Sequence, residues 1–470
     1  MNRREFILSA SAAASTQPAF SKALDISGLR DVTLLRSDAP EAREYHRSYS
    51  RKPVGVPKLR ALCSSEIGVS DTLRWAQEKS LGFAIRSGGH SFEGFSYHPD
   101  LVIDLRQMNT VRFDRNAQTV TVGPGAHLGT VARTLAKHNA SVPGGICPTV
   151  AMSGYTLGGG IGYFGRRDGL LIDQLQSLRM ITADGTPVTA SAAKNPDLFW
   201  ACRGGGGGNF GIVTEMTFRT QPAEPMQYVH LVEAVDAVRA AEILFLWQHN
   251  CQAYPRHTTL HLRITRRQDT NFLIVLEGLS GWDSDTLTQE ISRLMRAPSS
   301  KIEHGLHAGT IANLTRRMMP EGHSISSEIL SHSHLFNGPV GERGTLDILS
   351  DLLNHPNGRL HLNIEPLGGA ISDVAPDATA FPHRTTSFVV QSQILLLPKD
   401  DRAAMAASNE AMREVLEPLS NQGVYVNYPD LKLKAWGQKY WGDNLPRLKA
   451  IKRKYDPDDV FDHAHSLNRA

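Results

Sequence analysis

Glycine-rich segments dominate the first half of the chain and restrict the folds that it can adopt. The most extreme is a run of five glycines, Gly204–Gly208, which stands between Trp200 and the β-type stretch Phe210–Thr214. Consecutive glycines lose much conformational entropy on folding, and they let the backbone come very close to another group. A flexible linker is the alternative, but a linker is rarely flanked by a tryptophan and an apolar strand. We therefore predict that this run approaches a ligand.

A second glycine segment, Arg86–Ser91, follows the apolar stretch Phe83–Ile85. A strand that enters a Ser-Gly-Gly turn presents successive backbone N–H groups, and such a nest holds phosphate groups. Arg86 would add positive charge there. Taken alone the pattern is weak, because any tight turn uses glycine. It becomes informative only in combination with other segments.

A third glycine segment contains the pattern Gly160-x-Gly162-x-x-Gly165, which has the spacing of a dinucleotide-binding fingerprint, with Asp184 about 20 residues further on. A Rossmann glycine loop follows an apolar strand and opens a helix. Here Pro148 and a small, polar stretch come before the pattern, and a further glycine interrupts any helix after it. We therefore predict that this segment is not a Rossmann loop.

Composition excludes several classes of protein. A chain of 470 residues is too long for one ordinary core and predicts two or three lobes. The net charge of +3 is small and the signs are mixed, which argues against a nucleic-acid partner. The most basic stretch, Lys449–Lys454, alternates with Leu448 and Ile451 and is expected to be a solvated helix face. No apolar run approaches the roughly 20 residues that cross a membrane, so we expect no membrane insertion.

The four cysteines fit neither a disulfide framework nor a structural zinc site, because they are few, scattered and unpaired in spacing: Cys63, Cys147, Cys202 and Cys251. The N-terminus is more informative. Asn2–Leu8 contains two arginines and is followed by the small, weakly apolar run Ser9–Ser15. This resembles a twin-arginine export signal, which carries folded proteins across a membrane, and a disordered tail is the alternative. We expect residues 1–25 to be the signal and the protein to be exported, or cytoplasmic if the segment is no signal.

The pattern of expected helices and strands changes twice along the chain. Short β-type runs alternate with helical patterns as far as Phe218, and the prolines of Gln221–Pro225 then predict a domain boundary. From Gly423 a short strand-like piece and a final helix follow. We expect a cofactor domain from residues 40–221, a substrate domain from 222–420, and a segment, 421–470, that returns to the first domain. Expected helices span 69–79, capped by Ser70 or Asp71, 127–138, 235–247 and 284–296, and expected strands span 101–105, 119–122, 259–265 and 272–277.

A fourth segment, Gly423–Asp430, places two tyrosines three residues apart, which taken alone would read as ordinary core residues. Together the four segments resemble the berberine-bridge-enzyme-like group of FAD-linked oxidases, within the vanillyl-alcohol-oxidase-type flavoproteins. The similarity covers Leu59–Val213 and Tyr425–Ser466, and Asp377–Arg384 also resembles a family segment. The resemblance implies an α+β fold: a PCMH-type FAD-binding domain of two α+β subdomains, and a substrate domain with a mainly antiparallel sheet backed by helices.

The resemblance implies FAD that is covalently bound at two points. In the family, the histidine of a Ser-Gly-Gly-His turn bonds to the flavin C8-methyl carbon, and here that residue is His90. The cysteine of a Gly-Ile-Cys-Pro-Thr-Val motif bonds to flavin C6, and here that residue is Cys147. Alone, either residue would be read as a core histidine or a buried thiol. A metal site is a poor alternative, because no second histidine or carboxylate lies at a ligand spacing.

The resemblance also assigns the catalytic chemistry. Tyr428 aligns with the tyrosine that serves as base in carbohydrate-oxidising relatives, although it would alternatively pack against the flavin ring. A phenol has a pKa near 10, so nearby positive charge or hydrogen bonds would have to lower the pKa of Tyr428. Tyr425 and Asn427 are the expected supporting residues, with Asn427 at the flavin edge. Val150 falls where relatives control the access of oxygen, and a small residue there favours an oxidase.

The expected reaction is oxidation of an alcohol, such as a sugar or a secondary metabolite, with molecular oxygen as acceptor and hydrogen peroxide as product. A dehydrogenase with another acceptor and an oxidative cyclase are alternatives that keep the cofactor, and a non-enzymatic scaffold is a third. Further residues expected to bind FAD are Arg86, Ser87, Gly88, Gly89, Ser91, Thr149, Gly154, Gly158, Gly159, Gly162, Gly211 and Val213.

One departure from the family concerns Leu367, where relatives often carry an aromatic residue before a Gly-Gly pair. A second active-site phenol is then missing, so the substrate class of tyrosine-pair relatives does not carry over. The determinants of substrate choice are expected between Tyr228 and Gln393, where the resemblance is weakest. The histidines of this region show no ligand pattern and are expected on the surface or in the core: His304, His307, His323, His332 and His334.

Overall fold

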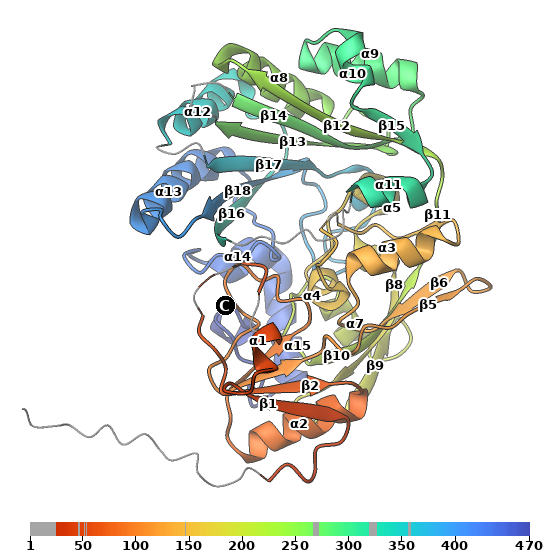
Figure 1. The fold of residues 1–470 in the computed structure, drawn as a ribbon, viewed down its shortest axis with the longest axis vertical. Coiled ribbons are helices and arrows are strands. Elements are labelled where there is room, and N and C mark those ends of the chain that lie inside the picture. The colour runs from red at the N-terminus through yellow and green to blue at the C-terminus, as the bar shows by residue number, and fades with distance from the viewer. Residues whose placement is uncertain are drawn as a thin grey trace, which may run out of the picture.

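The computed structural model describes residues 25–470 except 46–47, 51, 53, 146, 267–271, 319–326 and 356–358. The twin-arginine-like segment and His323 lie outside the described residues. Helices and sheets form separate layers, and a large sheet with its own helices lies above the glycine-rich half of the chain (Figure 1). Among the described residues, no helix combines the length and the apolar character that a membrane-spanning segment requires.

The first sheet of the glycine-rich half has the order β1-β2-β4-β3. Strands β2, β3 and β4 are parallel and β1 runs antiparallel to β2. β2 and β4 are buried along their whole length because the helix α2 covers them. β1 is a half-exposed edge strand before residue 40, so the expected start of the domain is wrong. The elements are β1 (Val32–Arg36), α1 (Ala42–Tyr45), β2 (Leu59–Cys63), α2 (Glu66–Glu78), β3 (Phe83–Arg86) and β4 (Leu101–Asp104).

The second sheet is antiparallel and has the order β5-β6-β10-β8-β9. Strands β7 and β11 form a separate two-stranded antiparallel sheet, and β11 lies just before the second domain. The strands of these two sheets are β5 (Val111–Asp114), β6 (Thr119–Val122), β7 (Ala140–Ser141), β8 (Leu175–Ile181), β9 (Pro187–Ser191), β10 (Ile212–Arg219) and β11 (Gln221–Pro222). The helices of this part of the chain are α3 (Leu128–Ala136), α4 (Met152–Leu157), α5 (Gly165–Asp168), α6 (Leu171–Gln174) and α7 (Pro196–Ala201).

The C-terminal segment packs into the core of the second sheet. Trp441 and Leu448 share one apolar cluster with Val120 and Phe218, although more than 200 residues of sequence separate the two pairs. Its helices are α14 (Trp436–Trp441) and α15 (Leu445–Tyr455). The C-terminal segment thus packs against the glycine-rich half of the chain, from which the seven-stranded sheet separates it in sequence.

The inserted part is built on an antiparallel sheet with the order β15-β12-β14-β13-β17-β18-β16. Helices α8, α9, α12 and α13 bury one face of it, and the other face is turned toward the glycine-rich half (Figure 1). Its strands are β12 (Met226–Val235), β13 (Thr258–Arg266), β14 (Phe272–Ser280), β15 (Leu306–Gly309), β16 (Glu328–Phe336), β17 (Leu360–Pro366) and β18 (Phe388–Leu396). Its helices are α8 (Ala237–Asn250), α9 (Ser284–Met295), α10 (Ser299–Glu303), α11 (Ile311–Met318), α12 (Gly341–Asn354) and α13 (Arg402–Leu419).

Two local expectations are wrong. Helix α2 begins at Glu66, because Ser65 caps it by accepting a hydrogen bond from the backbone N–H of Gly68. Lys452 does not belong to a solvated helix face. It is fully buried, and its ammonium group lies 2.6 Å from Asp456 Oδ2 and donates to the carbonyl of Phe461. A sequence pattern cannot reveal such a pairing, because the partners lie on the loop after the helix.

Candidate active site

One large cavity, of about 690 Å³, lies between the glycine-rich half and the exposed face of the seven-stranded sheet. It collects residues from all four glycine-rich or aromatic segments that the sequence singled out. Of the predicted site residues, those that line it are Ser87, Gly88, Gly89, His90, Ser91, Cys147, Val150, Gly154, Gly162, Gly211, Val213, Tyr425, Asn427 and Tyr428. The cavity is therefore the candidate active site.

Four predicted residues lie behind the wall instead: Arg86, Thr149, Gly158 and Gly159. Arg86 is buried, donates to Ser48 Oγ at 2.9 Å, and packs so closely on the turn that a Cβ at Gly89 would lie 2.5 Å from its Nη2. Burial lowers the pKa of Arg86 to about 10. The guanidinium thus supports the turn from behind rather than lining the cavity.

The third glycine segment is shaped by close packing. A Cβ at Gly162 would lie 2.0 Å from the carbonyl oxygen of Gly144, and one at Gly158 would lie 2.0 Å from Asn427 Oδ1. No Rossmann unit is present here, because the segment forms the short helices α4, α5 and α6. Asp184 sits in a remote turn, where it accepts hydrogen bonds from Thr182 and Thr186. The rejection of a Rossmann loop is confirmed.

The run Gly204–Gly208 divides into two parts. A Cβ at Gly204 would lie 2.4 Å from the backbone nitrogen of Phe381, and one at Gly205 would lie 2.4 Å from the carbonyl oxygen of Ala201. These two glycines are required by the packing of the protein on itself. Gly206–Gly208 line the cavity, and a Cβ there would meet no atom closer than 3.4 Å. Only the second part leaves its backbone open to a ligand.

His90 and Cys147 come from different loops and meet at one threonine. Thr149 Oγ1 lies 3.0 Å from His90 Nε2 and 3.7 Å from Cys147 Sγ. The ring of Tyr49 stacks on the imidazole with centroids 4.1 Å apart. Burial lowers the pKa of His90 to about 3, so the imidazole is neutral near pH 7 and one ring nitrogen keeps its lone pair. This is the state in which an imidazole can form a new bond to carbon.

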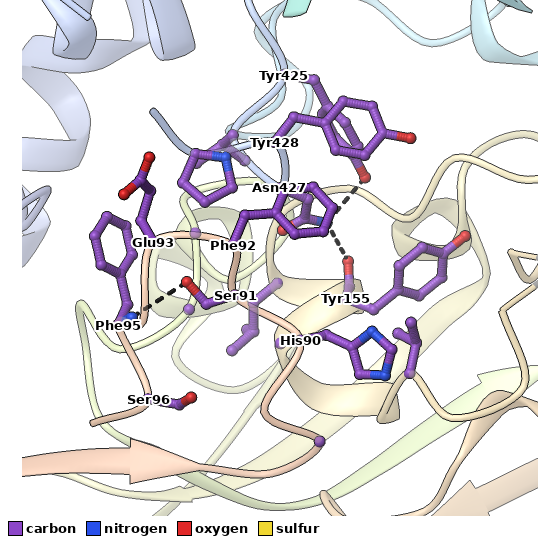
Figure 2. Close-up of a pocket in the computed structure, with 18 of the residues that line it drawn as sticks. His90, Ser91, Phe92, Glu93, Phe95, Ser96, Tyr155, Tyr425, Asn427 and Tyr428 are labelled. Carbon is purple, nitrogen blue, oxygen red and sulfur yellow. Dashed lines mark hydrogen bonds between the residues drawn. The ribbon is translucent and has the colours of Figure 1, made fainter. Parts of the chain in front are cut away.

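Tyr425 and Asn427 form a fixed network at the floor of the cavity (Figure 2). The phenolic oxygen of Tyr425 accepts from the backbone N–H of Gly160 at 3.0 Å and from Asn427 Nδ2 at 2.9 Å. Asn427 Nδ2 also donates to the carbonyl of Tyr155 at 2.9 Å. Burial raises the pKa of Tyr425 to about 12, although these hydrogen bonds act in the opposite direction. The segment is an irregular turn, so the expected strand around residue 425 is wrong.

Tyr428 differs from the expectation in its electrostatics. Its hydroxyl donates to Glu365 Oε1 at 2.9 Å, so its partner is a carboxylate rather than a cation. Burial and the carboxylate together raise the pKa of Tyr428 well above its ordinary value. The prediction of a lowered pKa is therefore wrong. A neutral phenol that donates to a carboxylate is the resting state of this pair.

Glu365 is a site residue that the sequence reasoning missed. Burial raises its pKa to about 7, while the hydrogen bond from Tyr428 and the charge of Arg263 oppose that shift. A carboxylate with this pKa is suited to general-base catalysis near neutral pH. A signal was present in strand β17, where His361, Asn363 and Glu365 alternate with buried apolar residues on the cavity side. The alternation identifies the polar face of the strand, but it does not identify the part of the molecule that this face contacts.

Unpaired polar atoms show that the cavity suits a large polar ligand. Tyr163 Oη and His261 Nε2 are buried in its wall and have no hydrogen-bond partner among the residues that the structure describes. A group with hydrogen-bonding edges would satisfy them, because buried polar atoms rarely remain unpaired. With the open backbone of Gly206–Gly208 on the other side, the residues present fit a flavin dinucleotide together with a small substrate.

The remaining candidates do not form sites. Three cysteines are buried, and all four are free thiols. No group of three or more potential metal ligands occurs among the described residues. His332 and His334 are core residues of β16, and His304 and His307 lie on or near the surface, as expected. Leu367, where relatives often carry an aromatic residue, is fully buried and does not line the cavity.

Comparison with known proteins gives the same picture for fold and cofactor. The family model of the FAD binding domain matches residues 57–191, and the model described as berberine and berberine like matches residues 424–468. The chain is 31% identical over 444 residues to the uncharacterized FAD-linked oxidoreductase YgaK of Bacillus subtilis, covering 92% of this chain and 96% of that protein. It is 27% identical to the aclacinomycin-N/aclacinomycin-A oxidase of Streptomyces galilaeus, covering 90% and 87% of the two chains.

Among solved structures, the berberine bridge enzyme of Eschscholzia californica superposes with a TM-score of 0.85 at 24% identity, covering 94% of this chain and 98% of that one. A berberine-bridge-enzyme-like protein of Physcomitrella patens superposes with a TM-score of 0.83 at 23% identity. These structures establish the fold, and the expected α+β architecture is confirmed.

Proposed function

Because the chain belongs to the berberine-bridge-enzyme-like family of FAD-linked oxidases, we propose that it oxidises an alcohol group of a small organic molecule, with FAD tethered to His90 and Cys147 and with molecular oxygen as acceptor. It is an FAD-linked oxidoreductase, and the substrate, the tether and the acceptor are the proposed part. The observation that carries the proposal is that His90 and Cys147, which both contact Thr149, line one cavity together with the Tyr428–Glu365 pair.

The surroundings of His90 and Cys147 support the proposed attachment. The neutral imidazole of His90 is held by Tyr49 and Thr149, and Thr149 belongs to the loop that carries Cys147, so this hydrogen bond connects the two loops. Two bonds to one ring system would fix it without walls that close around it. The open cavity above it then admits a substrate of appreciable size.

Removal of the hydroxyl proton is assigned to the Tyr428–Glu365 pair. A carbinol carbon releases hydride readily only as its hydroxyl loses a proton, so a base is needed within hydrogen-bond reach. Tyr428 donates to Glu365, and the carboxylate is the group whose pKa lies near neutrality. The proton therefore passes to this pair and rests on Glu365, while the C–O bond becomes a carbonyl. When bound, FAD supplies the oxidant that accepts the hydride, and oxygen takes up the two electrons as hydrogen peroxide.

The tether is tested by acid precipitation of the purified holoenzyme, followed by mass mapping of flavin-bearing peptides. Flavin on peptides of both His90 and Cys147 is expected. His90→Ala and Cys147→Ala should each leave flavin on the other residue, and the double variant should release all of it. Cys202→Ser, at a buried thiol outside the cavity, is the matched control and should keep both bonds. Free FAD in the supernatant of the wild type would contradict the proposal.

The acceptor is tested by comparing turnover with oxygen and with an artificial dye. Val150 lines the cavity beside Cys147, and we assign it to the passage of oxygen. Val150→Leu should slow the reaction with oxygen and leave reduction of the dye unchanged. Turnover with the dye but not with oxygen in the wild type would instead identify a dehydrogenase, and a product with a new C–C or C–O bond would identify a cyclase.

Export is the second proposed property, and it rests on Arg3 and Arg4 followed by the run Ser9–Ser15. A twin-arginine route would carry the folded protein, so the flavin is bound before export. Replacing both arginines by lysine should retain the protein inside the cell with its flavin in place. Cell fractionation checks this, and unchanged export of the double variant would contradict it.

A further inference from the structure

The cavity wall formed by the seven-stranded sheet carries one positive charge and several amides. Arg263 of β13 is the only lysine or arginine among the described residues that line the cavity. Beside it lie Asn363 of β17 and Gln391 and Gln393 of β18, all on the same face. Amides of this kind bind hydroxyl groups, and a guanidinium binds anions.

Arg263 is oriented but not neutralised. Its Nε donates to Asn363 Oδ1 at 2.7 Å, and Asn363 lies directly opposite it in the sheet register. In the part of the chain that the structure describes, it has no carboxylate within ion-pair distance, and its side chain is exposed to the cavity. One edge of the guanidinium is therefore fixed, and the two Nη groups remain free to bind a ligand.

The carboxylates that line the cavity already have donors of their own. Glu277 accepts from the hydroxyl of Tyr228 at 2.6 Å, and Asp462 accepts from Arg469 Nε at 2.6 Å. Glu93 pairs with Lys52. Glu365 accepts from Tyr428. Among the described residues of the wall, Arg263 is thus the charged side chain without a carboxylate within ion-pair distance, and its Nη groups can bind an anionic group of a ligand.

The register of β13 and β17 gives the separation between Arg263 and the proposed base, Glu365. Arg263 pairs with Asn363, so Glu365 is its diagonal neighbour on β17. Diagonal neighbours on one face of an antiparallel pair lie about 7–8 Å apart. A molecule with a carboxylate at Arg263 and a hydroxyl at Glu365 therefore spans about one sugar ring.

From this geometry we infer that the substrate is a compact polyhydroxy acid, such as a uronic or aldonic acid, whose carboxylate binds the Nη groups of Arg263 while the amides of Asn363, Gln391 and Gln393 hold its hydroxyl groups. The inference rests on the proposed function, because it takes Glu365 and Tyr428 as the site of proton removal. The carboxylate itself does not react. It selects the substrate and sets which hydroxyl reaches the base.

The test compares pairs of sugars that differ only at C6, where one has a carboxylate and the other a neutral CH2OH group: D-glucuronate with D-glucose, and D-galacturonate with D-galactose. Dissociation constants are measured with the holoenzyme by the change in flavin absorbance under anaerobic conditions and by calorimetry, and initial rates are measured with oxygen. The acids are expected to bind at least 10-fold more tightly than the neutral sugars. Arg263→Gln should remove this preference by weakening the acids about 10- to 100-fold, and the neutral sugars should lose much less, because for them only the orientation of Asn363 is affected.

Two variants sharpen the test. Arg263→Lys keeps the charge but loses the planar fork, so it should restore only part of the preference. Arg256→Gln removes a surface arginine that pairs with Asp373 outside the cavity and should leave all constants unchanged. Equal weakening of acids and neutral sugars by Arg263→Gln, or a wild-type preference for the neutral sugars, would overturn the inference.

The failure of this inference can be distinguished from the failure of the proposed function. If neutral alcohols reduce the flavin and the acids do not, the enzyme is an alcohol oxidase and Arg263 does not bind the carboxylate of a substrate. If the acids bind and perturb the flavin spectrum but no alcohol of either kind reduces it, the anion site stands and the proposed reaction is wrong.

Discussion

Glu365 should control the pH dependence of the reaction. The carboxylate must be ionised to accept a proton, and its pKa is raised to about 7. The rate of flavin reduction should therefore rise with pH through about 7 and level off above it. Glu365→Gln should lower this rate by about 100-fold or more and remove the inflection. Anaerobic stopped-flow absorbance measures both, and Glu277→Gln, at the other carboxylate of the same wall, should keep the inflection.

The same residue should affect stability in the opposite sense from an ordinary carboxylate. A carboxyl whose pKa is raised in the folded state loses its proton more easily when the chain is unfolded. Its contribution to the free energy of unfolding therefore falls as pH rises from about 4.5 to about 7. Glu365→Gln should melt above the wild type at pH 8, by about a few degrees, and near it at pH 5. A higher wild-type melting temperature at pH 8 would show that the carboxylate is stabilised as an ion.

Cavity residues that stand in short motifs were predictable from the sequence, whereas those on the sheet wall were not. His90, Cys147 and Asn427 stand in short motifs, and the structure brings them to one cavity. Glu365 and Arg263 lie about a hundred residues apart on strands whose pairing depends on the whole sheet. Only the register makes them neighbours, and no local pattern encodes it.

At the scale of the element, the glycine run should show two separable functions. Gly204→Ala adds a Cβ 2.4 Å from a backbone atom at a φ of +116°, so the variant should fold poorly and give little soluble protein. Gly207→Ala meets no protein atom closer than 3.8 Å, so it should fold normally. It lines the cavity, however, and should bind less flavin per chain. Soluble yield and the ratio of flavin to protein absorbance separate the two effects, and equal behaviour of the two variants would refute the division.

Helices and strands were predicted well where one face is buried, and less well where contacts between loops determine the backbone conformation. The helices α8 and α9 and the strands β13 and β14 lie close to their expected bounds, because their apolar spacing matches the core that they cover. The turn at Tyr425–Tyr428 was expected as a strand. Its conformation is set by Asn427 and by the backbone of Gly160, which lie far apart in the chain.

At the scale of the molecule, the order of the domains was readable but their contact was not. The proline-containing boundary at Gln221–Pro225 and the change of texture near Gly423 mark where the chain leaves and re-enters the first domain. The cavity exists because the polar face of the inserted sheet is held over the glycine-rich loops. That placement depends on buried polar contacts between distant segments, which leave no periodic trace in the sequence.

Arg166 is the clearest of these contacts and provides the last prediction. It extends from α5 of the first domain, is almost fully buried, and donates to the carbonyls of Tyr254, Thr258 and Leu367 in the second domain, at 2.7, 3.1 and 2.7 Å. Arg166→Met would remove the charged donor from all three carbonyls, of which, among the residues that the structure describes, only that of Leu367 keeps a second donor, Gln252 Nε2 at 3.1 Å. Each buried acceptor left unpaired costs about 1–3 kcal/mol. The two domains should then unfold in separate thermal transitions, with the inserted domain melting first.

Differential scanning calorimetry and flavin fluorescence, recorded on the same holoenzyme, follow the two domains. In the wild type the calorimetric transition and the loss of the flavin signal should coincide, because the domains unfold together. Arg179→Gln is the control, since this arginine of β8 pairs with Glu66 of α2 within the first domain. If Arg166→Met keeps one coincident transition at the wild-type temperature, the position of the sheet over the cavity is maintained by apolar packing alone. The catalytic geometry would then depend on the shape of the two surfaces and not on this buried cation.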